Sequence, residues 1–133
     1  MANTTFSGPV RSQNGFQSIT VSSTTGAVTV NSTFDTGVVL GTQSLSGAGA
    51  VDITNAFTSL TTTGASQALT LADGTVGEVK VIAHTVDGGS AVLTPTTKIG
   101  FSTITFTGVG ESATLVYTSA GWAIVALNGA VAA

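Results

Sequence analysis

The residues best suited to acid–base chemistry fall largely in one stretch, LTLADGTVGEVKVIAHTVDGG, which runs from Leu69 to Gly89. General acid–base catalysis needs two titratable groups that converge in a cleft from which water is excluded. Asp73 and Asp87 each precede a glycine, and aspartate in an Asp-Gly turn is favoured because its side chain bonds nearby backbone amides. Turn formation therefore explains both acids without catalysis.

The strand expected within this stretch alternates apolar and polar residues, which predicts one buried face and one exposed face. The side chains expected to point inward are Val79, Val81 and Ala83. Those expected to point outward are Glu78, Lys80 and His84. Ile82 interrupts the polar face, which indicates that this face is partly covered. We interpret these polar residues as part of a strand surface and not as an active site.

His84 is the single histidine of the chain, so a Ser-His-Asp triad would need it. The nucleophile motif G-x-S-x-G does not occur, because the nearest segments, GASQA and GGSAV, lack the final glycine. One histidine per chain near the axis of a homotrimer is a conceivable metal site, but an ordinary histidine on a strand face is favoured. No phosphate loop or calcium loop is present, so we expect no cofactor, no metal and no enzymatic activity.

The composition excludes several classes of function. Charged residues make up 7% of the 133 residues, whereas about 25% is usual, and the net charge is -3. Three Lys and Arg residues are too few for a nucleic-acid binder, and no apolar run approaches the roughly 20 residues of a membrane-spanning helix. With no cysteine, thiol chemistry is excluded. An uncharged, hydroxyl-rich surface suits subunits packed in dense arrays, although a biased composition alone also explains it.

The elements that carry these residues are predicted to be strands. Thr and Val are abundant and β-branched, alternation recurs along the chain, and Gly-containing turns separate about nine or ten runs. We expect an all-β fold, an antiparallel two-sheet sandwich or jelly-roll-like domain over residues 18–133, with a hairpin at 113–127. The segments ATLVYT and WAIVALNG are apolar on both faces, which predicts burial in the sandwich or under a neighbouring subunit.

Residues 1–17 have a different pattern and are predicted to form an extended N-terminal arm, which is either disordered or lies across another surface. The side chains expected to bind a partner are Phe6, Pro9, Val10, Arg11 and Phe16.

Residues 69–129 resemble a β-rich module common in structural proteins of tailed marine bacteriophages, including fibres and collars, and residues 1–16 resemble the start of small capsid or head decoration proteins of such phages. The opening MANTTFSGPVRSQNGF is similar to the start of such proteins. The remaining matching positions are Gly74, Gly77, Lys80, Gly88, Gly89, Ala91, Leu93, Pro95, Thr103 to Phe106, Gly110, Ser112, Ala113, Leu115, Gly121, Trp122 and Ile124.

The resemblance implies a non-enzymatic cement protein on the outer surface of the virion capsid. Its expected partners are the major capsid protein and itself, most often as a homotrimer. One alternative is a fibre or appendage module that binds a host receptor or glycan, with Trp122 or Tyr117 as a stacking platform; a core position is favoured for Trp122. A small glycosidase or lyase is the third alternative, and it would need a pair of carboxylates about 5–10 Å apart.

Overall fold

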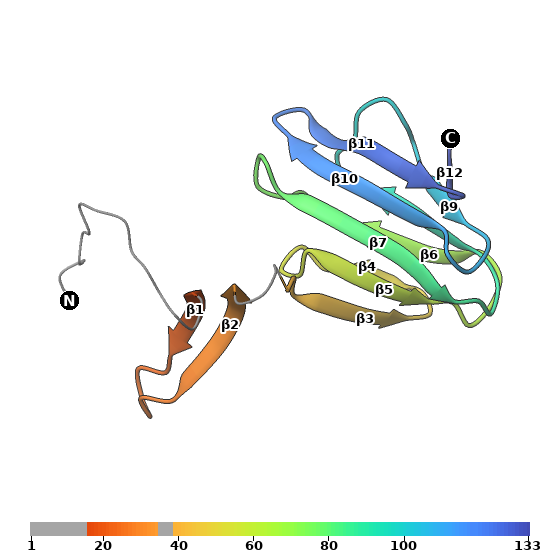
Figure 1. Cartoon of the computed structure of the whole chain (residues 1–133). Helices are drawn as coiled ribbons and strands as arrows, with labels where there is room; N and C mark the ends of the chain where they lie inside the picture. The colour runs from red at the N-terminus through yellow and green to blue at the C-terminus, as the bar shows by residue number, and fades with distance from the viewer. Residues whose placement is uncertain (1–15, 35–38) are drawn as a thin grey trace. The chain divides into compact units, whose positions relative to one another are not determined.

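The computed structural model describes residues 16–34 and 39–133, and the chain divides into two units, residues 1–39 and 40–133. In the first unit, β1 (Phe16–Val21) and β2 (Val28–Phe34) form an antiparallel hairpin (Figure 1). This division differs from the predicted boundary after residue 17, because β1 and β2 pair only with each other. Of the predicted arm residues, Phe16 begins β1, whereas Phe6, Pro9, Val10 and Arg11 lie outside the described residues.

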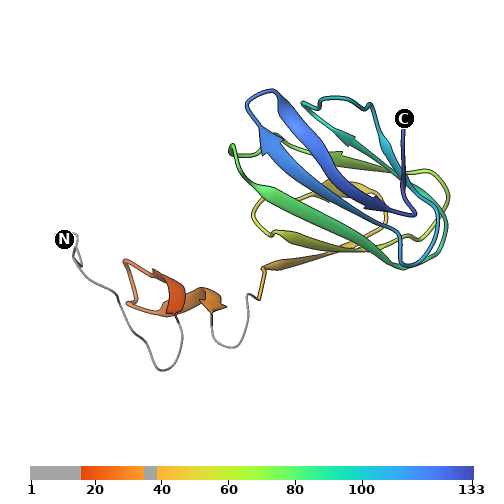
Figure 2. The ribbon, with the colours of Figure 1, turned by 45° about the horizontal axis from the view of Figure 1, so that its top comes forward.

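The second unit is a β-sandwich of two five-stranded sheets (Figures 1 and 2), which confirms the all-β, two-sheet prediction. Sheet I has the order β11-β10-β7-β5-β3, and sheet II has the order β12-β9-β8-β6-β4. The strands of sheet I are β3 (Thr42–Ser46), β5 (Phe57–Thr61), β7 (Val79–Val86), β10 (Ser112–Thr118) and β11 (Gly121–Asn128). Those of sheet II are β4 (Gly49–Val51), β6 (Gln67–Leu71), β8 (Ala91–Pro95), β9 (Ile104–Phe106) and β12 (Val131–Ala132).

From β3 to β8, successive strands alternate between the two sheets, so the chain winds as a flattened coil. In sheet I, β3 pairs with β5 and β5 with β7, and in sheet II, β4 pairs with β6 and β6 with β8. All four of these pairs are parallel, so the prediction of an antiparallel sandwich is wrong for them. Parallel neighbours need a long crossover connection, and here the crossover is a strand of the opposite sheet.

The rest of the sandwich is antiparallel. Strands β10 and β11 form the predicted hairpin, with Thr118 opposite Gly121 at the turn, and β10 also pairs with β7. The register shifts between Thr114 and Leu115, and Val125 has no partner opposite it. This bulge changes which side chains face inward, because an extra residue reverses the alternation. Trp122 is accordingly buried, whereas Ala126, four positions further along the strand, is exposed.

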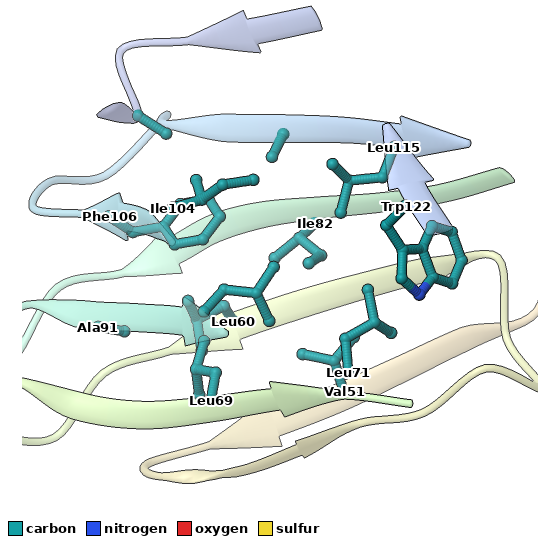
Figure 3. Packing of buried hydrophobic residues seen from close by; sticks show 13 residues of the cluster. Val51, Leu60, Leu69, Leu71, Ile82, Ala91, Ile104, Phe106, Leu115 and Trp122 are labelled. Carbon is teal, nitrogen blue, oxygen red and sulfur yellow. The ribbon is translucent and has the colours of Figure 1, made fainter. Parts of the chain in front are cut away.

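Thirteen buried apolar residues fill the space between the sheets (Figure 3). Burial of one large apolar side chain stabilises the fold by about 1.5–3 kcal/mol, so this cluster is the main source of stability. Val51 is buried at the end of β4, whereas Ile53 lies beyond the strand and is exposed. The buried residues are Val51, Leu60, Leu69, Leu71, Ile82, Ala91, Leu93, Ile104, Phe106, Ala113, Leu115, Trp122 and Ala130.

Candidate functional site

Strand β7 lies at the centre of sheet I, and the face that it buries in the core is the opposite of the one predicted. Lys80, Ile82 and His84 are buried, with exposed fractions of 0%, 0% and 1%. Val79 is exposed, and Val81 and Ala83 are half-buried on the outer face. The prediction failed because it assigned valines to the core and charged groups to water. The inward polar groups instead find partners inside the sandwich, and Ile82 between them was the signal of the true inner face.

Lys80 lies at one end of the core, under the loop that joins β4 to β5. Its Nζ donates a hydrogen bond of 2.5 Å to the backbone oxygen of Asn55 and lies 4.0 Å from Oδ1 of Asp52. Burial lowers the pKa of the Lys80 ammonium below its ordinary value, and the Asp52 and Glu78 carboxylates oppose that effect. This is the one ion pair within 4.0 Å in the described part of the chain.

Asp52 organises the loop above Lys80. Its carboxylate accepts hydrogen bonds from the backbone N–H of Asn55 at 2.8 Å, from the Asn55 side-chain amide at 3.0 Å and from the Thr54 hydroxyl at 3.2 Å. Burial raises the pKa of Asp52, but the bonds from Asn55, the Lys80 charge and the bond from Thr54 together hold it below 3.8. Asp52 and Asn55 were not predicted as partners of Lys80, because the loop and the strand are distant in sequence.

A second buried polar cluster surrounds His84. Its Nε2 lies 3.0 Å from the Thr62 hydroxyl oxygen, which also accepts the backbone N–H of Gly88 at 2.8 Å and donates to the Gly89 oxygen at 2.8 Å. With the hydroxyl proton donated to Gly89, the tautomer of His84 that carries its hydrogen on Nε2 fits this contact. The other ring nitrogen, Nδ1, is buried with no hydrogen-bond partner. This arrangement fits a structural histidine that ties β7 to the β5–β6 connection and the β7–β8 turn.

The other acids of the Leu69–Gly89 stretch bond nearby backbone or hydroxyl groups. Asp73 accepts the backbone N–H and the hydroxyl of Thr97, each at 3.0 Å, and Glu78 accepts the N–H of Thr75 at 2.8 Å. Asp87 accepts the N–H of Gly89 at 2.8 Å, as expected for an Asp-Gly turn. Each of these acids therefore has a structural use, and the stretch as a whole does not assemble one catalytic centre.

Trp122, considered as a sugar-stacking platform, is fully buried with an exposed fraction of 0%. Its indole Nε1 donates to the Ala72 oxygen at 2.8 Å, and its ring packs edge to face against Tyr117 with centroids 5.2 Å apart. Figure 3 shows the indole at one end of the core cluster. The core interpretation of Trp122 is therefore correct, and no face of this indole is free to stack on a sugar.

The outer face of sheet I carries an apolar patch, which we call the sheet I patch. The patch consists of Phe57, Val79, Val81, Val116, Ala123 and Val125. Its members are neighbours across adjacent strands or along one face of a strand. Phe57 pairs with Val81, Val79 pairs with Val116, and Val116 in turn pairs with Ala123. Val79 and Val125 have exposed fractions of 48% and 62%.

Neither outer face of the sandwich has a charged side chain on a strand. Within the ten strands of the second unit, Lys80 is the only charged residue, and it points inward. The outer face of sheet II is built from smaller side chains than the sheet I patch, namely Ala50, Ala68, Thr70, Val92, Thr94, Thr105 and Val131. Apart from Lys80, the charged residues of the second unit thus lie in its loops.

Within residues 16–34 and 39–133, no group of three or more His, Asp or Glu side chains is placed to hold a metal ion. No helix long and apolar enough to cross a membrane occurs in these residues either. No protein-family model matches the chain, and no curated protein matches it.

Proposed function

We propose that the chain is a capsid decoration protein, a non-enzymatic subunit that binds the outer surface of a phage head and stabilises the shell. The proposal combines the resemblance of residues 1–16 and 69–129 with the geometry of the sandwich. The observation that carries it is the sheet I patch, an apolar area on a broad face without charged strand residues.

In this proposal the sheet I patch faces the major capsid protein. Apolar patches of this kind mark interaction sites on soluble domains, and the absence of charge removes like-charge repulsion between neighbours in a dense array. Each square ångström of apolar surface buried would contribute about 25 cal/mol before the losses of freedom on binding. Three linked copies would raise retention further, because the second and third contacts become intramolecular.

The patch is tested by placing a charge in it. We expect Val79→Glu to reduce occupancy on genome-free heads on the order of tenfold or more, because an unpaired charge is expensive to bury. Val131→Glu is the matched control, since Val131 is an exposed strand valine on the outer face of sheet II. Occupancy is measured by co-sedimentation with heads assembled from the major capsid protein of the same phage.

Sizing of both variants by multi-angle light scattering separates shell binding from self-association. We expect a mass of three chains for the wild type and for both variants. Equal loss of occupancy in the two variants, or no loss in either, would reject the sheet I patch as the shell contact. Deletion of residues 2–16, which removes Phe6, Pro9, Val10 and Arg11, tests the arm in the same assay, and unchanged occupancy would reject its assignment.

Trp122 is fully buried and Tyr117 is partly buried against the core, so neither aromatic side chain supports a glycan-binding appendage module.

A further inference from the structure

Lys80 is buried with fewer partners than its ammonium group can use. An ammonium has three N–H donors, and the structure provides one hydrogen bond, to the Asn55 oxygen, and one carboxylate at 4.0 Å. Burial of an ammonium is expensive unless it is fully paired or becomes neutral. The position of this lysine therefore calls for an explanation beyond ordinary packing.

The surroundings of Lys80 hold the parts of an amide-forming reaction. The Asp52 carboxylate lies between the amine and a carboxamide: Oδ1 is 4.0 Å from Nζ of Lys80, and Oδ2 accepts the side-chain N–H of Asn55 at 3.0 Å. Nζ also touches the backbone oxygen of Asn55, so the amine lies against the residue that carries the carboxamide. One carboxylate thus has an oxygen toward each of the two groups.

We propose that Lys80 and Asn55 form an intramolecular amide cross-link, with Asp52 carrying the proton. In the first step, Asp52 takes one proton from the Lys80 ammonium, which leaves a neutral amine. The Nζ lone pair then attacks Cγ of Asn55 and forms a C–N bond. The bond from Cγ to Nδ2 breaks, and the departing nitrogen receives the proton from Asp52 and a second proton from Nζ. The products are a secondary amide and one ammonium ion, with Asp52 again a carboxylate, so no oxidant or other reactant is needed.

The electrostatics of the cluster favour the attack by Lys80 and oppose the first proton transfer to Asp52. Burial lowers the pKa of Lys80, which favours the neutral amine that attacks. The pKa of Asp52 lies below its ordinary value, so proton transfer from Lys80 to Asp52 is uphill, and the proton, once transferred, passes readily to the leaving nitrogen. The product amide would remove a buried charge and join the central strand of sheet I to the β4–β5 loop, across 25 positions of the chain.

The positions of the basic residues provide a direct test. The chain contains only Arg11, Lys80 and Lys98 as trypsin sites, and a lysine in an amide is not cleaved. The wild-type protein, purified as the full chain, is denatured, digested with trypsin and weighed by mass spectrometry. We expect a single fragment of residues 12–98, lighter than its sequence by one ammonia. Separate fragments 12–80 and 81–98 of full mass would overturn the proposal.

Variants locate the bond within that fragment. We expect Asn55→Ala to restore cleavage after residue 80 and the full sequence mass. Asn128→Ala is the matched control: Asn128 also donates from its side-chain amide to a backbone oxygen, that of Gly110 at 2.9 Å, and the cross-link should survive. Loss of ammonia with normal cleavage after Lys80 would indicate cyclisation of an asparagine and would reject the cross-link.

The wild-type digest decides the question even if the variants do not fold. The inference is independent of the proposed function, since capsid binding has no part in the chemistry.

Discussion

At the scale of single residues, the charged groups of the sandwich serve mainly to close turns. Glu111 is the clearest case, because its carboxylate accepts the backbone N–H of Thr107 at 2.5 Å and the Thr107 hydroxyl at 2.8 Å. These bonds join the two ends of the turn between β9 and β10. The backbone N–H of Thr107, more than any other contact, lowers the pKa of Glu111 below 4.5.

The lowered pKa of Glu111 predicts a defined pH dependence. A carboxyl group whose pKa is lower in the folded state stabilises the fold above its unfolded pKa, and this contribution is lost as the pH falls through the folded value. We expect Glu111→Gln to lower the melting temperature at pH 7, because the amide loses one of the two charge-assisted bonds. The difference from the wild type should shrink below about pH 4.5. Thermal unfolding between pH 7 and pH 3 measures it, and a constant difference would contradict the assignment.

At the scale of elements, the connections between strands in successive windings of the β3–β8 coil are held together by close backbone packing. The β7–β8 turn lies against the β5–β6 connection, and a Cβ added to Gly89 would lie 2.5 Å from the backbone of Gly64. Gly89 also has a φ of +141°, which side chains other than glycine rarely adopt. Glycine is therefore required here for two reasons, close approach and backbone conformation.

Two glycine variants separate these reasons. Gly100 has a φ of +79°, but a Cβ there would meet nothing within 4 Å. We expect Gly100→Ala to lower the free energy of unfolding by about 1–2 kcal/mol, the cost of the left-handed conformation. We expect Gly89→Ala to lower it by at least twice as much, because the backbones must also separate. Urea denaturation measures both, and equal losses would show that close packing at Gly89 adds nothing.

At the scale of the whole molecule, the second unit has a self-sufficient core. Among the residues whose burial the structure describes, all thirteen buried apolar side chains lie between Val51 and Ala130, within the second unit. We expect residues 40–133 expressed alone to unfold cooperatively, with a melting temperature within a few degrees of the full chain. Calorimetry on both proteins is the measurement. An unfolded fragment would show that the sandwich needs the preceding residues.

The sequence alone determined the all-β class, the β10–β11 hairpin and the core position of Trp122. These features follow from local properties: β-branched composition, alternation within a strand, and glycine at a tight turn. The turn role of Asp87 is local in the same sense, since it bonds the N–H of Gly89, whereas Asp73 bonds Thr97, 24 positions away, and not its own turn as predicted.

Only the tertiary structure decided the parallel pairing, the inner face of β7 and the cluster of Lys80, Asp52 and Asn55. Alternation shows that a strand has two faces, but it does not show which face is buried when polar groups find partners inside. Short runs separated by turns look alike whether the next strand pairs beside its predecessor or crosses to the other sheet. That choice depends on contacts between residues 15 to 25 positions apart, such as Thr42 with Phe57 and Lys80 with Asn55, which no local pattern encodes.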